Sequence, residues 1–281
     1  MIINKTHTHT PFSWFKQMET ARGVQRCNAQ RDTPLKIVDV QGDGHCFYRC
    51  LYRIVRGNPD LRRVFLTPVS HFCQQYHETE DEAVGYIRES VASSFWPETD
   101  VCHSNEDFEL ASSIVQNLVH LKLNERAEDI DDMLPLLQSI SRDMDVEDIM
   151  EAMFYTVKDT ATFASAVEID IVKAKLERQH VHLAVISFDS QEPMSKHIEK
   201  WLSDLASIMR AIRGRRVTHG SALDQTVACG RMAVLVNYDN VHYKVMRFRG
   251  KYLFDFTDFF NYVQSCIESY HTDGSDSSVD D

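Results

Sequence analysis

A turn containing two glycines that runs directly into an amphipathic segment is the feature that most constrains the fold. The turn comprises residues 42–45, and Cys46 follows it. Apolar residues then recur at the spacing of one helix face: Phe47, Leu51, Ile54 and Val55. Helix-breaking residues at 57–59 predict that this helix ends near Arg56. The pattern therefore places Cys46 in the first turn of a helix.

The first turn of a helix is a favourable place for a reactive cysteine. Its unpaired backbone N–H groups and the positive end of the helix dipole stabilise a thiolate, which is the nucleophilic form. Gly42 and Gly44 permit backbone angles that other residues resist, and they let a substrate carbonyl approach bare amides. A buried core cysteine beside a turn is the alternative interpretation of Cys46.

Residues 43–49 resemble the active-site motif of the ovarian-tumour (OTU) family of cysteine deubiquitinases. The family motif is Asp-Gly-x-Cys, an aromatic or aliphatic pair, and Arg, and it often has Asn at the position of His45. A second block, His242-Tyr243 at the start of a β-rich run, resembles the family's histidine signature. A third block at 146–188 matches in part, with Phe163 where the family frequently has Trp. The resemblance covers roughly residues 35–247.

The resemblance implies a fold and a reaction. The fold is α/β (more strictly α+β) of the papain type, with a small mixed sheet between helical layers. The thiolate of Cys46 would attack the carbonyl that follows the C-terminal Gly-Gly of ubiquitin or a ubiquitin-like protein. His242, 196 positions downstream, would act as general base and acid, and Gly44 and His45 would form the oxyanion turn. No cofactor or metal is expected.

The residue that orients the histidine is left open by the sequence. Many OTU proteins carry Asp or Asn two residues after the histidine, but here that position is Lys244, which cannot accept from an imidazole N–H. If positions 248 and 251 pair across a tight turn, opposed residues sum to 499, and Lys244 faces Asp255. This register makes Asp255 a candidate orienting residue.

Two other residues compete with Asp255 for this role. Asn240 lies two positions before the histidine, and Asp43 is counted as catalytic in some descriptions of the family. Asp43 is also expected to hold the oxyanion turn through a local side-chain hydrogen bond. Glu168, near a predicted helix start, is expected to have a structural role.

Pattern and breaker residues divide the chain into four regions. We predict an irregular N-terminal extension at 1–34, an OTU-like catalytic domain at 35–249, a C-terminal hairpin strand and helix at 250–269, and a disordered acidic tail at 270–281. Strands are predicted at 35–40, 181–186, 232–237 and 241–246 within the domain, and at 251–256 after it. A helical insertion at 189–230 has apolar residues at helical spacing. It either packs on the domain or docks a partner.

Charge and cysteine usage limit the functional classes. A net charge of −12 argues against nucleic acid as the main partner and suits a basic protein partner. Seven scattered cysteines without a Cys-x-x-Cys pair suggest neither a disulfide framework nor a zinc site. The sequence shows neither an apolar membrane span nor a secretory signal, so we expect an intracellular location, either cytoplasmic or nuclear. A viral protein that acts in a host cell also fits this expectation.

Two rival functions remain beside the deubiquitinase. The first is a catalytically dead module that keeps the fold to bind ubiquitin, for which Lys244 is the only support. The second is an OTU-type protease that cleaves another polypeptide. Neither the linkage preference nor the oligomeric state follows from the sequence.

Overall fold

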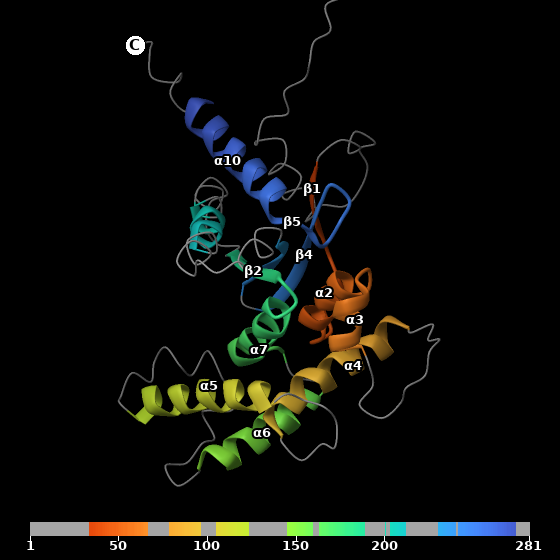
Figure 1. Ribbon diagram of the computed structural model, residues 1–281, viewed down its shortest axis with the longest axis vertical. Coiled ribbons are helices and arrows are strands. Elements are labelled where there is room, and N and C mark those ends of the chain that lie inside the picture. Colours follow the sequence, from red (N-terminus) through yellow and green to blue (C-terminus); the bar gives the residue numbers. More distant parts are fainter. Residues whose placement is uncertain are drawn as a thin grey trace, which may run out of the picture. The chain divides into compact units, whose positions relative to one another are not determined.

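The computed structural model describes residues 34–66, 79–96, 105–123, 145–159, 163–188, 200, 203–211, 230–239 and 241–273 (Figure 1). They form a mixed α/β structure with a small mixed sheet. The chain divides into two compact units. One unit spans residues 40–181 and is helical, and the other combines residues up to 39 with those from 182 onwards and contains the sheet. Among the described residues, no helix is long and apolar enough to cross a membrane.

The helical unit begins with the helix predicted from the sequence. Its elements are α2 (Cys46–Val55), α3 (Pro59–Phe65), α4 (Glu80–Ala92), the 3-10 turn η1 (Ser93–Phe95), α5 (Asn105–Leu123), α6 (Val146–Lys158) and α7 (Ala166–Glu177). Local capping explains where several helices start. Asn58 accepts hydrogen bonds from two backbone N–H groups of α3, and Thr79 and Glu82 form a capping box at α4. The helix α2 ends at Val55 with Arg56 as its C-cap residue, close to the predicted end.

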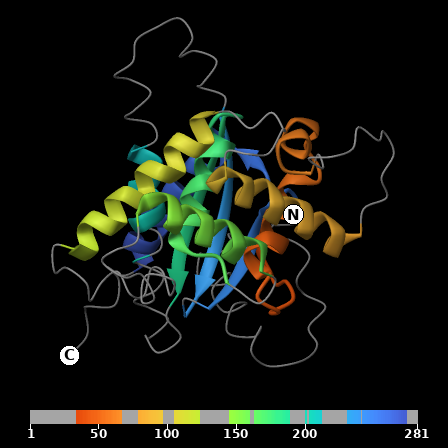
Figure 2. The same cartoon turned by 90° about the horizontal axis from the view of Figure 1, so that it is seen from below.

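The core of the helical unit lies around α4. This helix packs against α2, α3 and α6, and α5 packs against both α6 and α7; the neighbouring helices can be followed in Figure 2. The face of α2 that the sequence predicted as apolar is buried, with Phe47, Leu51 and Val55 each at most 1% exposed. The helix that begins at Cys46 is therefore fixed on its inner side by the unit's own core.

In the part of the sheet unit that the structure describes there are five strands, one long helix and the shorter helical stretch 203–211. The strands are β1 (Leu35–Val38), β2 (Val181–Phe188), β3 (Arg231–Tyr238), β4 (His242–Phe248) and β5 (Phe254–Asp255), and the long helix is α10 (Phe256–Asp273). Their order in the sheet is β1-β4-β3-β2, and β5 pairs with β3. The pairing of β1 with β4 is antiparallel, from Leu35 opposite Phe248 to Val38 opposite Val245, so opposed positions sum to 283.

The predicted helix in the 189–230 insertion is present where the structure describes it. Residues 203–211 are helical, and Leu205 and Met209 are buried in one cluster with side chains of the sheet and of α10. This part of the insertion therefore packs on its own unit. Apart from Lys200 and Gly230, the rest of the insertion lies outside the described residues, as do the extension before Pro34 and the tail after Asp273.

The predicted C-terminal hairpin is wrong beyond its turn. Phe248 does pair with Lys251, but the following residues leave β4, and Asp255 lies opposite Arg231 of β3 instead of Lys244. The physical reason is that β4 is already flanked by β1 and β3, so neither of its edges can take a third strand. The helix α10 then continues through Asp273, so the predicted tail is helical over its first residues.

Candidate active site

The turn that carries the predicted nucleophile, residues 42–46 and here called the nucleophile turn, places Cys46 in the first turn of a helix, as the sequence predicted. Cys46 is the first residue of α2 and is 1% exposed, and His45 is the N-cap residue. Gly44 has a φ of 81°, in the left-handed region that glycine adopts without strain. Of the cysteines that the structure describes, Cys46, Cys50 and Cys266, none is in a disulfide. Cys46 is thus a thiol at a helix N-terminus, the position that favours its thiolate.

The peptide between Gly44 and His45 is held at both ends. The His45 N–H donates to Asp43 Oδ1 over 3.1 Å, and the Gly44 carbonyl accepts from Arg88 Nη2 over 3.3 Å. The local hydrogen bond predicted for Asp43 is therefore present. It also corrects the predicted oxyanion turn, because the His45 N–H is used to hold the turn. Gly44 remains as the predicted backbone donor.

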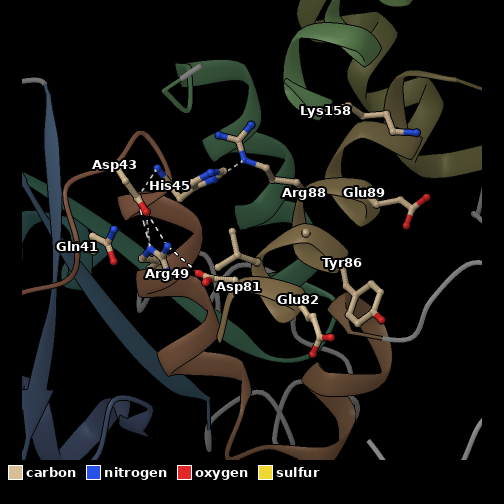
Figure 3. Close-up of a pocket in the computed structure, with 12 residues that line it drawn as sticks. Gln41, Asp43, His45, Arg49, Asp81, Glu82, Tyr86, Arg88, Glu89 and Lys158 are labelled. Carbon is tan, nitrogen blue, oxygen red and sulfur yellow. Dashed lines mark hydrogen bonds and ion pairs between the residues drawn. The ribbon is translucent and has the colours of Figure 1, made fainter. Parts of the chain in front are cut away.

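Arg49, the arginine of the motif, fixes Asp43 in turn. Its Nη2 donates to Asp43 Oδ2 over 2.6 Å, its Nε lies 3.2 Å from the same oxygen, and Asp81 of α4 accepts from it over 2.8 Å (Figure 3). The hydrogen bond from Arg49 is the main reason that the pKa of Asp43 lies below its ordinary value. Asp43 is therefore a carboxylate with a structural contact on each oxygen.

Arg88 is a residue that the sequence analysis missed. It lies on α4, is 2% exposed, and donates from Nε to His45 Nδ1 over 3.1 Å. It also donates to the backbone carbonyls of Val157 and Asp159 at the end of α6. Its guanidinium lies over the ring of Tyr48 at 4.4 Å. One buried side chain thus ties the nucleophile turn to two helices.

Burial and the contact with Arg88 together determine the protonation state of His45. Burial lowers the pKa of His45, and the positive charge of Arg88 lowers it further. The imidazole is therefore neutral at neutral pH. Because its Nδ1 accepts from Arg88, the ring proton is on Nε2.

A second buried contact supports the helix that begins at Cys46. The hydroxyl of Tyr48 donates to Glu168 Oε1, and Glu168 Oε2 accepts from the Ser165 N–H over 2.6 Å in a capping box. Tyr48 and Glu168 are at most 2% exposed. Burial raises the pKa of Glu168 above its ordinary value, and these hydrogen bonds oppose the rise. Glu168 has the structural role predicted for it.

An open hollow of about 690 Å³ lies beside the nucleophile turn (Figure 3). Asp43 and His45 line it on one side, and α4 contributes Asp81, Tyr86 and Glu89 on the other. All of its lining residues belong to the helical unit. Charged side chains thus surround the space next to the residue that precedes Cys46.

The predicted base has a carboxylate partner. His242 is the first residue of β4, and its Nε2 lies 2.7 Å from Asp39 Oδ1, while Lys244 Nζ lies 3.2 Å from Asp39 Oδ2. Burial of Asp39 alone would raise its pKa, but the hydrogen bond from His242 and the charge of Lys244 outweigh it, and the pKa is lowered. Asp39 is therefore an acceptor, and the ring proton is on His242 Nε2.

Asp39, which the sequence analysis did not single out, occupies the place sought for Asp255. The register of β1 with β4, continued by one residue, puts position 39 opposite position 244, since 283 − 244 = 39. Asp255 instead accepts from the Asp258 N–H over 2.9 Å at the start of α10. Asn240, the remaining candidate, lies outside the described residues.

The structure therefore assembles the predicted site residues in two groups. Asp43, Gly44, His45 and Cys46 form the turn in the helical unit, and His242 lies with Asp39 in the sheet unit. Within the described residues, no group of three or more His, Cys, Asp or Glu side chains could hold a metal ion. No protein-family model, curated protein or solved structure was found to match the chain.

Proposed function

We propose that the protein is a thiol-dependent isopeptidase of the OTU type, which removes ubiquitin or a ubiquitin-like protein from its conjugates. The observation that supports this best is the nucleophile turn. A cysteine begins a helix directly after a glycine with positive φ, and the peptide before it is fixed by hydrogen bonds at both ends. A core cysteine needs none of these contacts for packing alone.

The proposed reaction uses the two ring nitrogens of His242 differently. Because Nε2 donates to Asp39, Nδ1 is the nitrogen that would exchange a proton with the Cys46 thiol. The reaction requires the imidazole to meet the thiol. The thiolate attacks the substrate carbonyl, and the Gly44 amide stabilises the resulting oxyanion. The loss of one such donor typically costs about 3 kcal/mol of barrier.

The remaining steps release the two products. The imidazolium protonates the leaving lysine amine, which departs with the substrate protein, and Cys46 stays bound to the modifier as a thioester. His242 then removes a proton from water, which attacks the thioester and frees the modifier's carboxylate and the thiol. The OTU resemblance points to ubiquitin as the modifier, and a chain of net charge −12 suits the arginines of its C-terminal tail.

Covalent capture by a ubiquitin propargylamide probe tests the proposal. We expect the full chain to form a stable adduct that is lost in Cys46→Ala and weakened in His242→Gln. Cys50→Ala is the matched control, because Cys50 is a buried cysteine on the same helix and its removal should leave labelling intact.

The other outcomes identify the rival functions. Measurable ubiquitin binding without an adduct would indicate a dead binding module. An adduct with a ubiquitin-like probe, but not with ubiquitin, would change the modifier and keep the mechanism. The third outcome is that the chain neither binds any modifier nor is labelled by one, although iodoacetamide still alkylates Cys46 rapidly. This result would indicate a protease for another polypeptide.

A further inference from the structure

Two side chains from one strand hold the two oxygens of Asp39. His242 and Lys244 are two positions apart on β4 and so share a face of the sheet. Asp39 Oδ1 lies 2.7 Å from His242 Nε2, and Asp39 Oδ2 lies 3.2 Å from Lys244 Nζ. The carboxylate therefore bridges the imidazole and the ammonium group.

Asp39 needs such a second contact because it is exposed. Its side chain is 63% exposed, and one hydrogen bond to an exposed carboxylate holds a rotamer weakly. Lys244 is better fixed, since its side chain is 18% exposed and its Nζ lies 4.5 Å from the centre of the Tyr238 ring. Tyr238 is the Cα partner of His242 in the pairing of β3 with β4. Lys244, which is the more rigid of the two, can thus set the position of the Asp39 carboxylate.

Lys244 can influence His242 only through Asp39 or through its charge. An ammonium group has no acceptor, so it cannot receive the imidazole N–H itself. It stands at the position where the OTU resemblance leads one to expect the orienting acceptor. The carboxylate comes instead from the end of β1, directly across the sheet.

We propose that Lys244 is a positioning residue, which fixes the Asp39 carboxylate so that it accepts from His242 Nε2 and keeps Nδ1 available for the thiol. This inference rests on the proposed role of His242 as the base. In this inference Asp39 replaces the acceptor that the OTU pattern has at position 244. Lys244, on the neighbouring strand, holds that carboxylate in place.

The test measures the imidazole tautomer and turnover separately. Long-range proton–nitrogen NMR spectra of the full chain with labelled histidine, at a pH where the ring is neutral, report which nitrogen carries the proton. His242→Gln assigns the signals. The parent should show the proton on Nε2, Asp39→Asn and Lys244→Arg should retain it, and Asp39→Ala and Lys244→Met should show a mixture of tautomers. Lys251→Met, an exposed lysine of the same unit, is the matched control.

Turnover of a ubiquitin C-terminal fluorogenic substrate supplies the second readout. Lys244→Met should lower kcat about two- to fivefold with KM unchanged, the size expected of a partly exposed contact. The double variant Asp39→Ala/Lys244→Met should be no slower than Asp39→Ala, because the lysine acts through the carboxylate. Additive losses, or a parental tautomer in Lys244→Met, would overturn the inference.

The two readouts separate this inference from the proposed function. If neither a ubiquitin nor a ubiquitin-like substrate is cleaved but the tautomer shifts in Lys244→Met, the proposed function is wrong, while the placement of the Asp39 carboxylate by Lys244 stands. If the substrate is cleaved through Cys46 while Lys244→Met changes neither the tautomer nor kcat, the function stands and the positioning role is wrong.

Discussion

The substitution Tyr48→Phe tests the buried hydrogen bond that supports α2, because it changes a single group. It removes one buried hydroxyl and leaves the ring that packs beneath Arg88. The lost hydrogen bond goes to Glu168, which then keeps a buried carboxylate oxygen without this donor. A hydrogen bond to a charged group contributes about 1.5–3 kcal/mol, against about 1 kcal/mol for a neutral pair. We therefore expect the free energy of unfolding to fall by about 2 kcal/mol at neutral pH.

The cost of Tyr48→Phe should depend on pH in a defined direction. Burial raises the pKa of Glu168 above its unfolded value of 4.5, so its contribution to stability is fully present below that value and is lost as pH rises through the folded pKa. The Tyr48 hydroxyl opposes this rise, and its removal raises the folded pKa further. The free energy of unfolding of the variant should be lower than that of the parent by about 1 kcal/mol at about pH 4 and by about 2–3 kcal/mol at about pH 8.

Chemical denaturation of the full chain at both pH values, followed by circular dichroism, measures this difference. Tyr155→Phe is the matched control, because Tyr155 is 61% exposed and its loss should change stability by less than about 0.5 kcal/mol. A cost for Tyr48→Phe that is equal at both pH values would refute the reasoning, since the hydroxyl would then not be bonded to an ionising carboxylate.

Three further outcomes follow from the ion pairs and caps. Asp107→Asn should lower the free energy of unfolding by about 3–5 kcal/mol, because Lys175 is left buried without its counter-charge; Asp170→Asn, in an exposed pair, should cost less than about 0.5 kcal/mol. Burial alone would raise the pKa of Asp107, but Lys175 and Arg178 lower it, so its stabilisation is present above its unfolded value of 3.8 and is lost as pH falls through the folded pKa. The melting temperatures of the parent and Asp107→Asn should therefore converge in acid. Asp255→Ala should lower the melting temperature through the loss of a helix cap worth about 1 kcal/mol, while fluorogenic turnover stays at the parental rate.

Features encoded by neighbouring residues were predictable from the sequence. The helix that begins at Cys46 follows from a glycine turn and an apolar stripe, and its end at Arg56 follows from the breakers after it. The hydrogen bond from His45 to Asp43 is likewise a contact between residues two apart. Such features depend on local backbone preferences, which a sequence shows directly.

The carboxylate that contacts His242 was not predictable in the same way. The hypothesis for Asp255 assumed that consecutive strands pair, whereas β4 pairs with β1, more than two hundred positions away. Strand order is a tertiary property, and an error in it assigns the wrong partner to every residue of the strand. The sequence shows that β4 should have neighbours, but it does not say which ones.

Arg88 was missed although the sequence contains a signal for it. Val84, Ile87 and Val91 recur at helical spacing, and position 88 lies on the same face. A charged residue within an apolar stripe predicts a buried charge with several acceptors, because burial without partners is costly. The partners themselves, at 44, 157 and 159, could not be inferred from that stripe.

The contacts of Arg88 also bear on the order in which the protein folds. Its guanidinium joins backbone carbonyls that are 44, 69 and 71 positions away along the chain. Closing loops of that length costs chain entropy before the contacts compensate for it, so the turn before Cys46 reaches its final geometry late. A nascent chain that has not yet been synthesised as far as Asp159 would contain Cys46 but not all the carbonyls that Arg88 binds. The turn before Cys46 would then reach its final geometry only when α6 docks.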